Sequence, residues 1–211
     1  EWTSAAMFDA MGVLSHGYND TPQAASRPYD AGRDGFVIAG GAGILVLEAL
    51  DHARKRGARI YAELSGYGAS SDGSDMITPE PEGVARAMRL ALAGAGLEQV
   101  DYLNTHAIST PIGDIRELSA VQTVFGAQLP FISSTKGLTG HAIAASGAHE
   151  AIYSLLMMEH GFLAPCVNLQ DPDPAAAGFP LITRCLERNI ASFMSNSLGF
   201  GGTNASLLFR R

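Results

Sequence analysis

Three polar turns carry most of the side chains that could do chemistry. They cover Asn104–Pro111, Ser134–His141 and Asn196–Asn204. Each follows a short apolar run of the kind that forms a buried strand, and open α/β sheets usually bind ligands just beyond the carboxyl ends of their strands. The three turns together are therefore the candidate functional site.

Two histidines in these turns, His106 and His141, are the candidate catalytic groups. Taken singly, each is more often a structural histidine than a catalyst. His141 is expected to open a long helix, and the positive potential at a helix N-terminus disfavours the imidazolium form. A neutral ring with one N–H donor is what a developing oxyanion or thioester enolate needs.

Lys136 and the glycine turn 199–202 (Gly-Phe-Gly-Gly) are the other candidates. Lys136 is either an ordinary exposed lysine or a fixed positive charge near His141, five residues later. The glycine turn is either a plain hairpin or a loop that aims backbone N–H groups at an anion. From the residues alone we predict an anion-stabilising α/β active site.

Two further motifs are incomplete. His149-Glu150 lacks the second histidine of a zinc-binding helix. Gly41-Ala42-Gly43 lacks the third glycine of a dinucleotide-binding turn. We therefore expect neither a metal site nor a dinucleotide site at these positions.

The apolar patterning predicts strands that alternate with helices. The expected strands are 36–39, 43–48, 60–66, 100–104, 131–133, 190–195 and 205–209. The expected helices are 48–56, 82–94, 113–125 and 141–160, and residues 1–35 are expected to be irregular. Such alternation is typical of a mixed or parallel α/β sheet with helices on its faces.

The composition excludes several classes of protein. The 211 residues are 46% hydrophobic and 17% charged, which suits a packed core and not a disordered chain. The net charge of −7 makes nucleic acid and anionic membranes poor partners. The two cysteines are too few to build a disulfide framework. No apolar run reaches the roughly twenty residues of a membrane span. The chain begins Glu1-Trp2-Thr3, with neither an initiator Met nor a basic-then-apolar signal, so we interpret this start as an internal cut. The expected location is cytoplasmic.

The motifs in combination resemble the β-ketoacyl-[acyl carrier protein] synthases. The resemblance is carried by Asn-Thr-His…Ser-Thr-Pro-x-Gly-Asp, Thr-Lys-x-x-Thr-Gly-His and Asn-Ser-x-Gly-Phe-Gly-Gly-Thr-Asn, in that order. The stretches Phe8–Gly12, Arg33–Gly41 and Glu159–Gly161 look most like the synthase I branch. The resemblance implies the thiolase-like α/β fold, which is layered α/β/α/β/α in the intact enzyme.

The resemblance also implies roles for the site residues in an acyltransferase of fatty-acid synthesis. His106 and His141 are expected to hold the malonyl thioester carbonyl and to stabilise the enolate formed as carbon dioxide leaves. The Phe200 amide is expected to stabilise an oxyanion, and its side chain to gate the acyl pocket. Lys136 supports the histidines, and Glu117 is expected to organise that lysine as a paired carboxylate.

The implied partner is acyl carrier protein bearing a phosphopantetheine-linked malonyl or acyl group, and the implied assembly is a homodimer. The implied reaction needs no metal and no organic cofactor. The expected substrate-binding positions are Ser109, Thr110, Gly199 and Gly201. Ile108 stands where the family has a threonine that binds the pantetheine arm, so one contact of about 0.5–1.5 kcal/mol is lost.

The nucleophilic cysteine of the family has no counterpart here. Cys166 and Cys185 lie where the family has no catalytic residue, so both are interpreted as structural. We therefore expect residues 1–55 to be the incomplete end of an N-terminal thiolase-like half and residues 56–211 to be the C-terminal half. A non-catalytic paralogue or partner that binds carrier protein is the alternative. A thiolase that uses coenzyme A fits less well, because residues 193–206 contain no cysteine.

Overall fold

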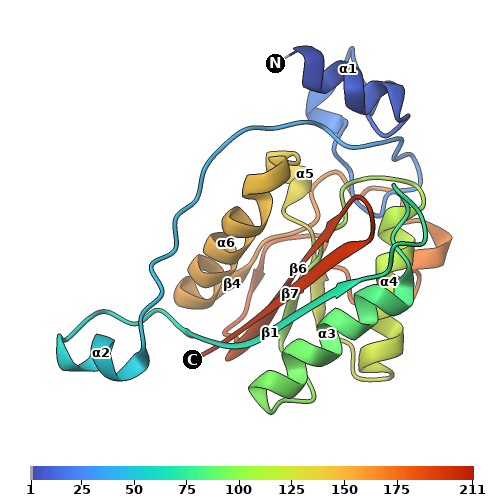
Figure 1. Cartoon of the computed structure of the whole chain (residues 1–211). Helices are drawn as coiled ribbons and strands as arrows, with labels where there is room; N and C mark the ends of the chain where they lie inside the picture. Colours follow the sequence, from blue (N-terminus) through green and yellow to red (C-terminus); the bar gives the residue numbers. More distant parts are fainter. Residues whose placement is uncertain (1) are drawn as a thin grey trace.

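A five-stranded mixed sheet organises residues 2–211, the part of the chain that the computed structural model describes (Figure 1). The strand order is β1-β7-β6-β2-β3. The pairs β1–β7 and β7–β6 are antiparallel, whereas β6–β2 and β2–β3 are parallel. The strands are β1 (Glu63–Ser71), β2 (Tyr102–Asn104), β3 (Phe131–Ser133), β6 (Ser192–Gly199) and β7 (Thr203–Arg210); β4 (Phe162–Leu163) and β5 (Leu186–Glu187) form a small second sheet.

Helices cover both faces of the main sheet. Helices α3 (Pro81–Ala95) and α4 (Gly113–Phe125) pack on one face, and α6 (Ser146–His160) packs on the other (Figure 1). The shorter elements are α1 (Trp2–Ala10), α2 (Leu50–Lys55), α5 (Lys136–Thr139), η1 (Pro22–Ala24), η2 (Ile143–Ala145) and η3 (Pro174–Ala176).

Side chains of the central strands point alternately to the two faces of the sheet and fill two separate hydrophobic cores. Phe193 of β6 and Phe209 of β7 stack with ring centroids 4.9 Å apart in the core beneath α6. Their neighbours Met194 and Leu208 belong to the other core, beneath α3 and α4. Because successive side chains of a strand point to opposite faces, one pair of strands serves both cores.

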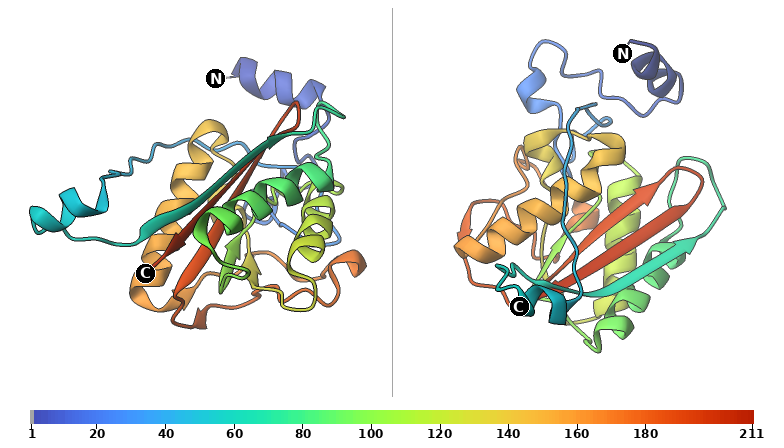
Figure 2. Two further views of the ribbon diagram at one scale, coloured as in Figure 1. Left: turned by 60° about the horizontal axis from the view of Figure 1, so that its bottom comes forward. Right: turned by 60° about the vertical axis from the view of Figure 1, so that its left-hand side comes forward.

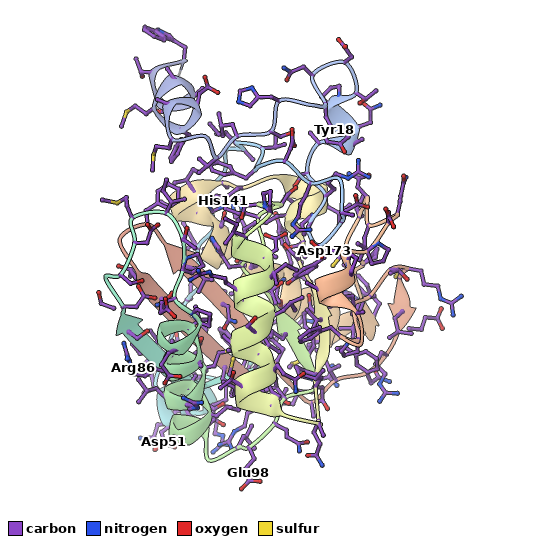
Figure 3. All side chains as sticks on the ribbon, turned by 90° about the vertical axis from the view of Figure 1, so that its right-hand side faces the viewer. Tyr18, Asp51, Arg86, Glu98, His141 and Asp173 are labelled. Atoms are coloured by element: carbon purple, nitrogen blue, oxygen red, sulfur yellow. The ribbon has the colours of Figure 1, made fainter. Side chains whose placement is uncertain are left out.

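The polar turns gather at one edge of the sheet because β2, β3 and β6 are mutually parallel. The turn 105–111 follows β2, the segment 134–141 follows β3, and the glycine turn 199–202 joins β6 to β7. Figure 3 shows His141 and Asp173 toward this end of the molecule, far from Glu98, which precedes β2. The expected meeting of the three turns is thus confirmed.

Most elements lie where the patterning predicts them. The helix 113–125 and the strand 131–133 are confirmed at both ends. The helices at 48–56 and 82–94 and the strands near 100–104, 190–195 and 205–209 are confirmed with shifted ends, and the strand expected at 60–66 occupies Glu63–Ser71. The helix expected at 141–160 begins only at Ser146, because a 3₁₀ turn at Ile143–Ala145 precedes it.

The N-terminal quarter differs from the prediction. Trp2–Ala10 is helical rather than irregular. Phe36 and Ile38 form isolated bridges, and 40–49 have no regular structure, so the strands expected at 36–39 and 43–48 are wrong for the described residues. Ile44 and Val46 are 86% and 80% exposed. A strand forms only where a neighbour accepts its backbone hydrogen bonds. Within the described chain, Gly41 and Gly43 lie against α6, and the segment then leaves it to reach α2 (Figure 2).

Two glycines of β1 allow α3 to lie directly on the sheet. A Cβ atom at Gly68 would lie 1.9 Å from the carbonyl oxygen of Ala87, and one at Gly66 would lie 2.0 Å from that of Ala91. Both carbonyls belong to α3. The strand and the helix therefore approach each other at backbone contact distance, which no side chain except hydrogen permits.

Replacing Gly68 with Ala is expected to force β1 away from α3 and to destabilise the protein by about 1–3 kcal/mol or more. Gly94→Ala is the matched control, because its Cβ would meet no atom closer than 3.7 Å. That control is expected to gain about 0.5–1 kcal/mol, since alanine favours helix interiors. Urea unfolding followed by circular dichroism measures both variants, and equal midpoints would contradict the close packing.

Candidate active site

The turn after β2 is held by two buried carboxylates of α4. The amides of His106 and Ala107 donate to the two oxygens of Glu117, at 2.9 Å each. The amides of residues 108–110 all donate to Oδ1 of Asp114, at 3.1–3.2 Å. Five consecutive N–H groups are thus satisfied by two side chains, which fixes the backbone from which His106 projects.

Asp114 and Glu117 can act together because residues three apart lie on the same face of a helix. Both are fully buried. Burial raises the pKa of Asp114 to about 6 and that of Glu117 to about 7, against the opposing effect of the N–H donors. Every carboxylate oxygen faces a donor, and Oε1 of Glu117 also accepts from the Asn196 side chain at 3.0 Å. The ionised form is therefore the one that matches the turn.

The rings of His106 and His141 meet edge to face, with centroids 5.2 Å apart and an interplanar angle of 87°. Both side chains are partly buried. Desolvation, then the charge of Lys136, lowers the pKa of His141 to about 3, and the same causes with His141 added lower that of His106 well below its ordinary value. Both rings are therefore neutral near pH 7, and each has one N–H to donate.

His141 is held by the N-terminal segment rather than by a helix. Its amide donates to the carbonyl of Val37 at 2.8 Å, and its carbonyl accepts from the amide of Ala39 at 2.9 Å. Its Nδ1 lies 2.9 Å from Oγ of Ser146, the first residue of α6. The expected placement at a helix start is thus wrong, and burial together with Lys136 replaces the helix dipole as the cause of neutrality.

Lys136 is buried, which excludes the ordinary exposed lysine. Its Nζ forms an ion pair with Glu150 of α6, which is equally buried. The expected pairing with Glu117 is therefore wrong, because that carboxylate is occupied by the turn amides. The sequence analysis did not identify Glu150 as the partner of Lys136, because it treated this residue only as part of an incomplete zinc motif. The position of Glu150, one turn into the helix that follows His141, could have indicated the pairing.

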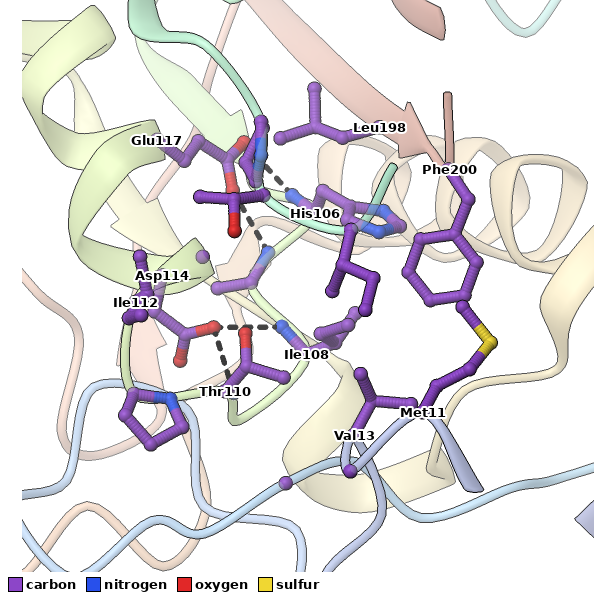
Figure 4. A pocket seen from close by; sticks show the side chains of 18 of the residues that line it. Met11, Val13, His106, Ile108, Thr110, Ile112, Asp114, Glu117, Leu198 and Phe200 are labelled. Carbon is purple, nitrogen blue, oxygen red and sulfur yellow. Dashed lines mark hydrogen bonds between the residues drawn. The ribbon is translucent and has the colours of Figure 1, made fainter. Parts of the chain in front are cut away.

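A cavity of about 300 Å³ opens beside His106 (Figure 4). Thr110 and Gly199, two of the expected substrate-binding positions, line it together with Phe200 and Ile108. Much of the remaining wall is apolar, formed by Met11, Val13, Ile77, Pro79, Ile112 and Leu198. The cavity thus combines one imidazole with a largely apolar surface.

Two of the expected substrate-binding residues lie outside this lining. Ser109 is fully buried, and its Oγ accepts the amide N–H of Arg27 at 3.1 Å. The amide of Gly201 donates to the carbonyl of Met76 at 2.8 Å. Both residues therefore hold the walls in place, and the loop 72–80 that Gly201 contacts is a wall that the sequence patterning did not reveal.

Neither cysteine lines the cavity. Cys166 is buried, its Sγ accepts the amide N–H of Ser134 at 3.3 Å, and burial raises its pKa to about 12. Cys185 is an exposed free thiol. Within residues 2–211, no group of three or more His, Cys, Asp or Glu side chains could hold a metal ion, and no helix is long and apolar enough to cross a membrane.

Solved structures resemble this arrangement over nearly the whole chain. A β-ketoacyl synthase from Burkholderia phymatum matches with a TM-score of 0.94 and 41% identity, covering 100% of this chain and 52% of that chain. A type II polyketide synthase acyl-carrier protein in complex with its ketosynthase matches with a TM-score of 0.94 and 36% identity, covering 98% and 52%. The fold and the site thus define a protein of the thiolase-like class.

Family models identify the family within this class. The model of the β-ketoacyl synthase C-terminal domain matches residues 61–170, and that of the N-terminal domain matches residues 1–53. The chain belongs to the β-ketoacyl synthase family.

Curated relatives span about twice the length of this chain. The 3-oxoacyl-[acyl-carrier-protein] synthase 1 of Escherichia coli (strain K12) is 56% identical over 210 residues, which are 100% of this chain and 52% of that protein. The mitochondrial 3-oxoacyl-[acyl-carrier-protein] synthase of Arabidopsis thaliana is 50% identical, covering 98% and 47%. The chain therefore corresponds to about half of such a protein.

The rings of His106 and His141 are expected to stay neutral between pH 5 and pH 8, with no titration in ¹⁵N-detected NMR of the histidine rings. Histidine in an unfolded chain takes up a proton near pH 6.5, whereas the folded His141 does so only near pH 3. The free energy of unfolding is therefore unaffected by these rings above pH 6.5 and decreases as the pH falls from 6.5 toward about 3. In the charge-neutral double variant Lys136→Met with Glu150→Gln, the pKa of His141 is expected to rise, since the neighbouring cation is gone. A His141 ring that titrates near pH 6.5 in the unaltered protein would contradict this electrostatic interpretation.

Proposed function

We propose that this chain contributes the histidine half of the active site of a 3-oxoacyl-[acyl-carrier-protein] synthase. The observation that carries the proposal is the pair of neutral histidine rings, 5.2 Å apart, of which His106 lines a largely apolar cavity. Two neutral N–H donors in a desolvated site can stabilise one developing oxyanion without transferring a full proton. Relatives at 56% identity bear the name of this activity.

In the proposed reaction, N–H groups of His106 and His141 bind the thioester carbonyl oxygen of the malonyl group. The bond between the malonyl α-carbon and its carboxylate breaks, its electron pair remains as the enolate, and carbon dioxide leaves. The enolate carbon then attacks the acyl thioester carbon on a cysteine, and the cysteine thiolate leaves as the tetrahedral intermediate collapses. We place that cysteine outside this chain, because none lines the cavity.

The other site residues support this chemistry. Burial, and then the charge of Lys136, which is paired with Glu150, lowers the pKa of both rings and keeps them unprotonated. The Phe200 amide is proposed to bind the tetrahedral oxyanion, and its side chain, 37% exposed at the cavity, to gate the acyl site. Thr110 and Gly199 are proposed to contact the arm of the substrate.

The partner proposed for this site is an acyl carrier protein with a phosphopantetheine arm, since a similar ketosynthase is described in complex with one. Residues 1–55 are proposed to be the incomplete end of the N-terminal half of the fold, and 56–211 to form the C-terminal half. The exposed apolar side chains of segment 40–49 support such packing. We further propose a cytoplasmic homodimer whose reaction requires no metal and no organic cofactor.

A non-catalytic carrier-binding paralogue is the second candidate. Ile108 favours it, because its side chain presents an apolar surface in the cavity where a hydroxyl would bind a polar arm. Such a protein would bind carrier protein and leave malonyl groups intact. Release of carbon dioxide therefore separates the two candidates.

His141→Ala in the full-length protein is expected to slow decarboxylation of malonyl carrier protein by about 10²–10³-fold, the usual effect of losing one oxyanion donor. His52→Ala, on the exposed face of α2, is the matched control and is expected to leave the rate unchanged. Release of ¹⁴CO₂ measures both. An unaltered rate in His141→Ala would exclude the role assigned to this histidine, and binding without decarboxylation in the unaltered protein would favour the paralogue.

A further inference from the structure

A buried guanidinium lies behind the catalytic turn, outside the cavity. The Arg33 side chain is 2% exposed. It donates to the carbonyls of Thr110 at 3.0 Å and Pro111 at 2.6 Å, and to that of Asp30 at 2.8 Å. Two of these carbonyls belong to the last residues of the turn that carries His106.

The charge of Arg33 is balanced by two carboxylates. Its Nη1 lies 2.8 Å from Oδ2 of Asp173, and its Nε lies 3.6 Å from Oδ2 of Asp114. Asp114 is the acceptor for the amides of residues 108–110. Arg33 therefore contacts both the backbone of the turn and the carboxylate that orders it.

The segment around Arg33 adds further bonds to the same turn. The amide of Gly35 donates to the carbonyl of Ser109 at 3.0 Å, and the amide of Tyr29 donates to Asp114 at 3.1 Å. Ser109 has a φ of +76°, in the left-handed region that residues with side chains rarely adopt. Such backbone persists only when its surroundings hold it, and here the segment 27–35 does so.

We propose that Arg33 is a positioning residue of this active site, which sets the orientation of His106 by clamping the turn 108–111 against Asp114. The effect of Arg33 on catalysis rests on the proposed function, whereas its clamping of the turn rests on the hydrogen bonds alone. Lysine cannot replace Arg33, because an ammonium lacks the planar fork that reaches three carbonyls and two carboxylates at once.

Hydrogen exchange of single amides in the full-length protein tests the clamp. In Arg33→Lys, exchange of the amides of residues 108–110 is expected to rise by about tenfold, while that of residues 106–107, held by Glu117, changes by less than about twofold. Arg27→Lys is the matched control, because its guanidinium contacts Asp30, Ala24 and the Tyr18 ring, none of which belongs to the turn. The bond from the Arg27 amide to Ser109 is a backbone bond that lysine keeps. Electron-transfer fragmentation with mass spectrometry resolves these amides.

The kinetic readout is a split between kcat and KM for malonyl decarboxylation. Arg33→Lys is expected to lower kcat by about tenfold or more with KM nearly unchanged, since misorientation of a catalytic ring acts on the transition state. Asp173→Asn, which removes one partner of Arg33 at a partly exposed position, is expected to act in the same direction more weakly and serves if Arg33→Lys does not fold.

The outcomes separate the two proposals. Uniform exchange across residues 106–110 in Arg33→Lys, or kinetics equal to those of Arg27→Lys, would overturn the positioning role. Faster exchange at residues 108–110 alone in Arg33→Lys would support the clamp. If the unaltered protein does not decarboxylate malonyl groups, the proposed function is rejected while the clamp stands.

Discussion

The site depends on two buried carboxylates that accept five consecutive backbone N–H groups. Burying Asp114 and Glu117 is unfavourable, as their raised pKa values of about 6 and about 7 show. The turn amides offset this at both oxygens of Glu117 and at Oδ1 of Asp114, while the amide of Tyr29 donates to Oδ2 of Asp114. Asn196 adds a side-chain donor to Glu117, and the charge of Arg33 lies 3.6 Å from Asp114. Because neither the turn nor the carboxylates can be satisfied without the other, the backbone at His106 has one conformation. The geometry of the proposed catalytic site thus begins with the carboxylates behind His106.

A second buried pair sets the electrostatics of the same site. Lys136 and Glu150 neutralise each other, yet the cation still acts on both imidazoles and, with burial, keeps them neutral. A neutral donor suits an enolate better than an imidazolium, which would readily transfer its proton to the carbon that must react. The two carboxylate systems therefore have separate tasks: one holds the backbone, and the other controls protonation.

Elements with periodic apolar residues can be predicted from the sequence. Contacts between residues that are far apart in the sequence cannot. Periodic apolar residues place the helix 113–125 correctly, and the parallel strands before the polar turns place His106, Lys136 and His141 at one edge. The spacing of residues does not reveal which carboxylate pairs with Lys136, because the partner of a buried charge is set by how the elements pack against each other. The run 43–48 has a strand's composition without a strand's neighbour in the described chain, so composition alone misleads there.

The most direct test of this account is the decarboxylation rate of Glu117→Gln in the full-length protein. Glutamine keeps the size of the side chain, but its NH₂ group must oppose one of the N–H donors that Glu117 now accepts. We expect kcat to fall by about a hundredfold with the circular dichroism spectrum unchanged, because a small misplacement of His106 has that effect. The exposed control Glu98→Gln is expected to retain the full rate. A Glu117→Gln rate within about twofold of the unaltered protein would contradict the dependence of His106 on these carboxylates.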